Sequence, residues 1–191
     1  MTQEALAARF REINGVHPMS AEDDAYVSRQ YRVLTELCAE HGRDVDEVRG
    51  LMLAGKLPMP GYLRSDGAEM VPADLFDLAD RVGLDNLRDW FVGHWQDVAD
   101  GNDEWAAYLS GQYVCLHSVT PATIQRKGQL IKAIDATTDP AELKVLVDEL
   151  DSLEPDFTAY DRLRFNGPMD AIVVVLNDQP IGLVMALAMP K

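Results

Sequence analysis

Hydrophobic positions recur at helical spacing along most of the chain, and capping residues mark where the segments begin. Ser20 and Asp23 have the spacing of a capping box, and Thr35 and Asp44 are placed to cap the next two helices. In the first half the pattern predicts helices over 2–13, 20–31, 36–41, 45–54 and 72–82. In the second half it predicts helices over 86–99, 104–117, 121–135, 140–152 and 157–164.

Two regions are typical of strands instead. Short extended runs at 57–63 and 69–71 flank Asp66-Gly67, which is a hairpin-turn signal. Near the C-terminus, the runs AIVVVL and IGLVMAL are rich in β-branched residues and are separated by Asn177-Asp178-Gln179-Pro180. A hairpin is the prediction there, and a buried terminal helix is the alternative because short apolar runs are ambiguous. An apolar tail needs cover, so a homodimer contact is a further hypothesis.

The segment 33–76 resembles the winged helix of excisionase-like and MerR-like DNA-binding domains. Its run AGKLPMP is similar to the end of the second helix and the first wing strand of that family. The resemblance implies that an outer helix face would enter the major groove, which here comprises Asp46, Glu47, Arg49, Gly50 and Leu53. Six basic and six acidic residues cancel across 28–66, whereas a DNA reader usually has a basic stripe. DNA binding is therefore disfavoured but stays open.

The predicted fold class is mainly α with minor β. We expect a winged-helix-like N-terminal unit over 1–83, packed on a helical unit over 84–167, and an apolar tail over 168–191 that forms the hairpin. No flexible linker separates the two units, so they are expected to share an interface.

Composition narrows the function classes. The 191 residues include 32 Asp and Glu against 17 Lys and Arg, a formal charge of −15 that disfavours nucleic acids and anionic membranes. No apolar run approaches the ~20 residues that span a bilayer, and the N-terminus lacks the pattern of a secretory signal, so the expected location is cytoplasmic. Cys38 and Cys115 lack metal-site or disulfide spacing, and no metal or cofactor motif is found.

A first candidate site lies on the predicted helix 86–99. His94 shares an apolar stripe with aromatic side chains and has a carboxylate, Asp97, nearby. A buried imidazole in such surroundings can act as a general base. The alternative is a core histidine that is hydrogen-bonded to a neighbour. The other members of the stripe are Trp90, Phe91, Trp95 and Val98.

A second candidate is the segment 103–127. Gly111 falls in the middle of the predicted helix, where it costs about 1 kcal/mol relative to alanine and so suggests close approach of another backbone or a ligand. Cys115 and His117 would point apart on that helix, so they do not form a nucleophile–base pair. His117 near the helix end also has a simpler role, as a cation that the helix dipole favours.

This segment carries a second resemblance. The pattern W..YLSGQYVCL..VTP..I..K runs from Trp105 to Lys127, and PGYLRSDGAEMVPADLF runs from Pro60 to Phe76. Together they resemble a bacterial family of unknown function whose members are described as natural-product biosynthesis proteins. The resemblance implies a cytoplasmic protein encoded with a secondary-metabolite pathway, and it supplies no catalytic residues.

Arg162 and Arg164 lie beside a Gly-Pro turn and could hold a carboxylate or phosphate, with Asp161 orienting one of them. The alternative is a surface ion pair worth about 0–1 kcal/mol. The leading functional hypothesis is a pathway protein that binds or transforms a small metabolite, by acid–base or cyclisation chemistry if it is an enzyme. The alternatives are a transcription regulator and a protein interaction module. The candidate catalytic residues are His94 and His117, and the candidate substrate-binding residues are Trp95, Trp105, Tyr108, Tyr113 and Arg164.

Overall fold

The computed structural model describes residues 2–155, 158, 160–161, 171–176 and 179–185. Helices dominate these residues and a small sheet accompanies them, so the predicted class, mainly α with minor β, is confirmed. The helices are α1 (Gln3–Asn14), α2 (Ala21–Gln30), α3 (Leu34–Glu40), α4 (Val45–Leu53), α5 (Asp77–Val82), α6 (Leu87–Val92), α7 (Val98–Leu109), α8 (Pro121–Ala136) and α9 (Pro140–Leu153). The strands are β1 (Arg32–Val33), β2 (Tyr62–Leu63), β3 (Glu69–Val71), β4 (Ala171–Leu176) and β5 (Gln179–Met185).

Local side-chain caps set several helix starts, as the sequence predicts. Ser20 and Asp23 form a reciprocal capping box at α2. Asp44 accepts hydrogen bonds from two backbone amides at the start of α4. Thr120 and Asp139 cap α8 and α9, each followed by proline at the first helical position.

Two predicted starts in the first half are wrong. Thr35 lies inside α3, which begins at Leu34 after Val33 and has no side-chain cap, because β1 runs directly into the helix. Pro72 does not open a helix either. Residues 73–76 form turns, and α5 begins only at Asp77.

The boundaries predicted in the second half also need correction. The helix predicted over 86–99 ends at Val92, and a new helix starts after Asp97, whose carboxylate accepts a hydrogen bond from the Ala99 amide. The helix predicted over 104–117 ends at Leu109. Residues 110–120 form a loop, so Gly111, Cys115 and His117 are not helical.

The three short strands form an antiparallel sheet in the order β1-β3-β2. The predicted hairpin at Asp66-Gly67 is the connection between β2 and β3, and β1 is a strand that the sequence did not predict. In the tail, β4 and β5 pair antiparallel. The helix predicted over 157–164 falls largely outside the described residues.

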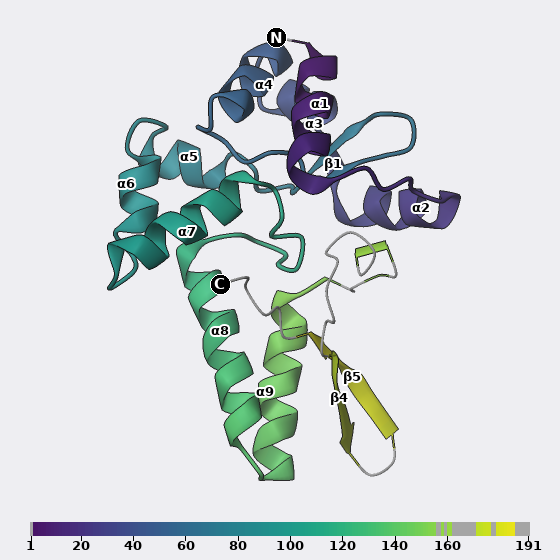
Figure 1. Cartoon of the computed structure of the whole chain (residues 1–191), viewed down its shortest axis with the longest axis vertical. Coiled ribbons are helices and arrows are strands. Elements are labelled where there is room, and N and C mark those ends of the chain that lie inside the picture. The colour runs from purple at the N-terminus through teal and green to yellow at the C-terminus, as the bar shows by residue number, and fades with distance from the viewer. Residues whose placement is uncertain (1, 156–157, 159, 162–170, 177–178, 186–191) are drawn as a thin grey trace.

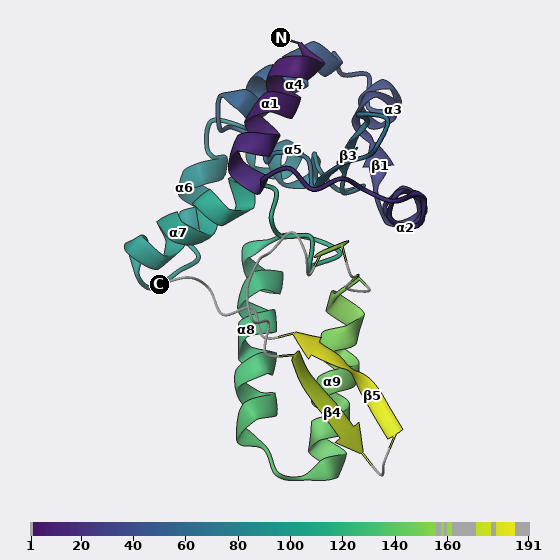
Figure 2. The same cartoon turned by 45° about the vertical axis from the view of Figure 1, so that its right-hand side comes forward.

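The largest apolar core joins the N-terminal helices to α5, α6 and α7. It extends from Leu6 in α1 to Tyr108 in α7, and so includes residues on both sides of position 83. Helices α8 and α9 have their own core, and they lie side by side as a hairpin that projects from the other helices (Figures 1 and 2). Leu130, Ile134, Val147 and Leu150 make up that second core.

A buried ion pair fixes α4 against the sheet. Arg49 donates to both carboxylate oxygens of Glu69 on β3, at 2.9 and 2.8 Å, and these two residues are only 7% and 2% exposed. A third hydrogen bond joins Arg49 to Asp46 at 2.9 Å. The placement of Arg49 on an outer, DNA-facing surface is therefore wrong. Of the five residues predicted for that surface, the two that are well exposed are Asp46 and Glu47.

Candidate functional site

The loop 110–120 approaches the segment before β2 very closely. Gly111 has φ of +72°, and a Cβ there would lie 2.5 Å from the carbonyl oxygen of Pro60 and 2.6 Å from that of Met59. The Met59 amide donates to the Leu109 carbonyl at 2.9 Å, which fixes the two segments side by side. The expectation that Gly111 permits close approach of another backbone is confirmed, although Gly111 lies after α7 and not within it.

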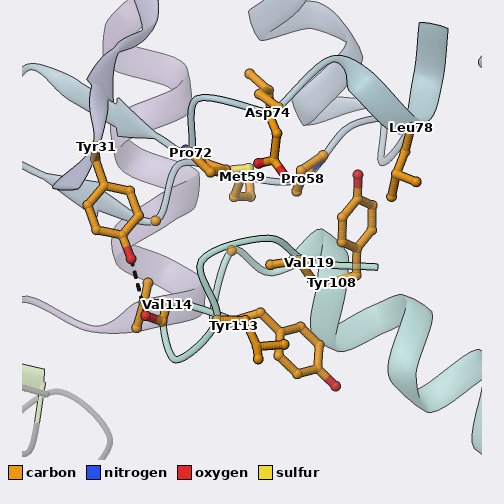
Figure 3. Close-up of a pocket in the computed structure, with 14 residues that line it drawn as sticks. Tyr31, Pro58, Met59, Pro72, Asp74, Leu78, Tyr108, Tyr113, Val114 and Val119 are labelled. Atoms are coloured by element: carbon orange, nitrogen blue, oxygen red, sulfur yellow. Dashed lines mark hydrogen bonds between the residues drawn. The ribbon is translucent and has the colours of Figure 1, made fainter. Parts of the chain in front are cut away.

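This junction leaves a small apolar hollow. Space open to the centres of water molecules is about 50 Å³, which holds only a few waters because each needs roughly 10–15 Å³ of such space. Its lining comes from Tyr31 directly before β1, the segment 58–61, the turns after β3, α5, the end of α7 and the loop 110–120 (Figure 3). The lining residues with polar side chains are Tyr31, Asp74, Tyr108 and Tyr113.

A second hollow of about 200 Å³ adjoins the first. Tyr31, Pro72, Asp74 and Leu116 line both hollows, and His117 lines the second. We call the two hollows together the Asp74 groove. It is mostly apolar with a few polar groups, which is the usual make-up of a small-molecule site.

Two polar groups of the groove, on Asp74 and Tyr31, have defined hydrogen-bond partners. The Ser118 hydroxyl donates to Asp74 Oδ2 at 2.5 Å, across 44 positions of sequence. The Tyr31 hydroxyl donates to the Val114 carbonyl at 3.1 Å. Burial raises the pKa of Tyr108, and the Asp74 carboxylate raises it further. The Tyr108 hydroxyl therefore keeps its proton and can act as a hydrogen-bond donor.

Three of the predicted site residues line the groove and differ in how they face it. Tyr108 and Tyr113 line the inner hollow, and Figure 3 shows the Tyr113 hydroxyl directed away from it. That hydroxyl donates to Glu104 instead. His117 is exposed and lines the outer hollow, and its backbone amide donates to the Leu153 carbonyl at 2.9 Å.

The predicted tryptophans pack in or against the largest apolar core, Trp105 as a buried member and Trp95 partly buried. Trp95 stacks on Phe91 with ring centroids 5.1 Å apart, and Trp105 packs on the same phenylalanine at 5.3 Å. His94 was expected to be buried on one continuous helix, and this is wrong. It is exposed, and its Nδ1–H donates to the Trp90 carbonyl at 2.7 Å. None of these side chains lines the Asp74 groove.

The structure describes one of the three residues of the predicted arginine site. Arg162 and Arg164 lie outside the described residues. Asp161 is buried, and its carboxylate accepts hydrogen bonds from the Tyr62 hydroxyl at 2.6 Å and from Thr158. Asp161 therefore anchors the segment after α9 to the sheet.

A buried ion pair lies beside the groove and was not predicted. Lys127 of α8, only 6% exposed, pairs with Glu154, which directly follows α9. Burial raises the pKa of the Cys115 thiol, although the nearby Lys127 ammonium opposes that shift. A raised thiol pKa leaves little thiolate at neutral pH. We therefore read this cluster as a support for loop 110–120 and not as a nucleophile.

Asp74, Ser118, Lys127 and Glu154 were the residues that sequence reasoning did not bring together. Each contact joins positions far apart in the chain, and no motif spacing records such pairs. The one usable signal was that Asp74 and Lys127 both fall within the two quoted stretches that carry the family resemblance.

Within the described ranges, no group of three or more His, Cys, Asp or Glu side chains is placed to hold a metal ion. No helix there combines the length and apolar character needed to cross a membrane. Residues 87–169 match a family described as "Family of unknown function (DUF6058)". The match begins at α6 and takes in α7, the loop 110–120, α8 and α9. No curated protein and no solved structure matches the chain.

Proposed function

We propose that the protein binds a small, largely apolar metabolite in the Asp74 groove, as part of a natural-product pathway. The observation that carries the proposal is the groove itself, an apolar hollow with a few polar groups. The groove is lined both by residues before position 87 and by the loop 110–120, which lies inside the family match. A ligand bound there would contact both the residues before position 87 and the loop 110–120.

The polar groups would support acid–base chemistry if the protein is an enzyme. His117 is the candidate proton carrier that reaches the groove, and Tyr108 stays protonated as a donor. His94 lies outside the groove with one ring nitrogen engaged. We therefore assign proton transfer to His117, and a His117→Gln variant that keeps full turnover of a pathway intermediate would exclude that role.

Binding in the groove can be tested without knowing the metabolite. Indole and phenol serve as apolar probes, and the chemical shifts of backbone amides report where they bind. Ala73 is exposed and lines the outer hollow, so Ala73→Trp fills the groove without disturbing the core. Ala136 is also exposed, at the end of α8, so Ala136→Trp is the matched control. We expect the probes to shift the amide resonances of loop 110–120 in Ala136→Trp but not in Ala73→Trp. Probe-induced shifts that occur elsewhere and persist in Ala73→Trp contradict the proposal.

A second candidate function is DNA binding through a winged helix, and one observation favours that fold. The elements α2, β1, α3, α4, β2 and β3 follow one another with the sheet order β1-β3-β2, and this order is compatible with the winged helix proposed for the segment. The charge on the exposed face of α4 argues that this segment has a structural role and does not bind DNA. Arg49 is turned inward to Glu69, and Asp46 and Glu47 remain on the exposed face of α4. A gel shift at low salt with the promoter of the protein's own operon separates the two: a sequence-selective shift that persists at physiological salt favours the regulator.

A further inference from the structure

We propose that the ligand of the Asp74 groove is an apolar molecule that carries a cationic amine, and that Asp74 binds the amine. This inference rests on the proposed function and names the ligand class of that site. Three features support it: the charge of the lining, the free oxygen of Asp74 and the aromatic rings around it.

The lining contains a carboxylate and no permanent cation. Among the described residues that line the two hollows, Asp74 is the one Asp or Glu, and neither Lys nor Arg occurs. His117 lines the outer hollow from the surface, where its side chain is exposed to solvent. A carboxylate or phosphate ligand would meet repulsion from Asp74 without a matching arginine or lysine, whereas an ammonium group would be attracted.

One carboxylate oxygen of Asp74 is available to accept a hydrogen bond from a ligand. Oδ2 accepts the hydrogen bond from Ser118, while Oδ1 has no hydrogen-bond partner in the part of the chain that the structure describes. Figure 3 shows the carboxylate directed into the hollow between Pro58 and Pro72. Asp74 is half-buried, so an ion pair formed there is less screened than one at the surface. A charge-assisted hydrogen bond from an ammonium N–H would complete the coordination of this carboxylate.

The aromatic lining favours the same ligand. Tyr31, Tyr108 and Tyr113 surround the inner hollow, and the faces of aromatic rings attract cations. Tyr108 keeps its proton and so adds no competing negative charge. The formal charge of −15 on the whole chain also draws cations toward the protein.

The test compares three probes of matched shape at neutral pH: 2-phenylethylamine, 2-phenylethanol and phenylacetate. Ligand-observed NMR gives their affinities, and protein-observed NMR shows whether loop 110–120 responds. We expect the amine to bind about tenfold more tightly than the alcohol, which corresponds to the advantage of a charge-assisted hydrogen bond over a neutral one. Phenylacetate should bind more weakly than the alcohol.

Two substitutions distinguish the effect of the Asp74 carboxylate on amine affinity from the effect of the protein's overall negative charge. Asp74→Asn keeps an oxygen for Ser118 and should reduce the amine to the affinity of the alcohol. Asp77→Asn removes the same charge three residues later, at an exposed position outside the lining, and should leave the preference intact. The melting temperature of each variant verifies that it is folded. Ser118→Ala keeps the carboxylate and should keep the amine preference.

The outcomes are distinguishable. Equal affinities of the amine and the alcohol, or an unchanged amine preference in Asp74→Asn, overturn the cation inference while binding in the groove stands. If Asp74→Asn and Asp77→Asn lose the amine preference equally, the preference comes from the negative charge of the whole protein, and the cation inference is overturned. If no probe shifts the resonances of loop 110–120, the proposed function fails together with this inference.

Discussion

Replacing Gly111 with alanine should destabilise the protein well beyond the ordinary effect of losing a glycine. A left-handed conformation costs an alanine about 1–2 kcal/mol. The new Cβ would also stand 2.5 Å from the Pro60 oxygen and 2.6 Å from the Met59 oxygen, both backbone atoms that cannot rotate away. Overpacking costs about 1–3 kcal/mol, and separating the segments breaks the Met59–Leu109 hydrogen bond, worth about 1 kcal/mol. The expected loss is therefore about 3–6 kcal/mol.

Gly42 provides a matched control. It also has positive φ, +62°, but no atom lies within 4 Å of the position of its Cβ. Gly42→Ala should therefore cost only the conformational share, about 1–2 kcal/mol. Urea unfolding with linear extrapolation measures both variants, and each kcal/mol should lower the melting temperature by about 2–4 °C. Equal losses for Gly111→Ala and Gly42→Ala would refute the claim that backbone contact determines this position.

Three further outcomes are expected. Glu154→Gln should cost about 3–5 kcal/mol in urea unfolding because it leaves the buried Lys127 ammonium without its counter-ion, and the double variant Lys127→Met/Glu154→Leu should recover most of that loss. The Arg64 guanidinium lowers the pKa of Asp66 to about 2, so this carboxylate stabilises the fold above its unfolded pKa near 4, and the contribution is lost as pH falls toward 2. When the free energy of unfolding is measured against pH, Arg64→Met should show a smaller loss in acid, because the Ala68 amide still lowers the pKa of Asp66; an unchanged loss contradicts the assignment. Deleting 169–191 should reduce a dimer to a monomer by light scattering if the tail forms the contact, and an unchanged mass excludes the tail.

Sequence reasoning succeeded where structure depends on near neighbours. Thr120-Pro121 and Asp139-Pro140 predicted the starts of α8 and α9 correctly, because a cap bonds to amides two or three residues away. The stripe from Trp90 to Val98 fitted one helix equally well, yet Val98 is 66% exposed and begins α7. Asp97 competes there as a cap, and periodicity alone does not reveal that competition.

The candidate site depended on distant partners and was predicted only in part. Tyr108, Tyr113 and His117 were identified from their types and do line the groove. Asp74 was missed because its partner Ser118 lies 44 positions later. Arg49 was placed outward for the same reason, since its partner on β3 is 20 positions away. Side-chain direction in both cases is decided by tertiary pairing, which local patterns do not record.

Hydrogen bonds at and beside the loop 110–120 connect it to two different parts of the molecule. At one end Leu109 accepts a hydrogen bond from Met59, and at the other the His117 amide donates to Leu153 at the end of α9. The loop therefore connects the projecting α8–α9 hairpin to the segment before β2. We therefore expect a partner that binds the distant end of the hairpin and tilts it to displace the segment that carries Tyr113, Val114 and Leu116, and so to change the width of the inner hollow.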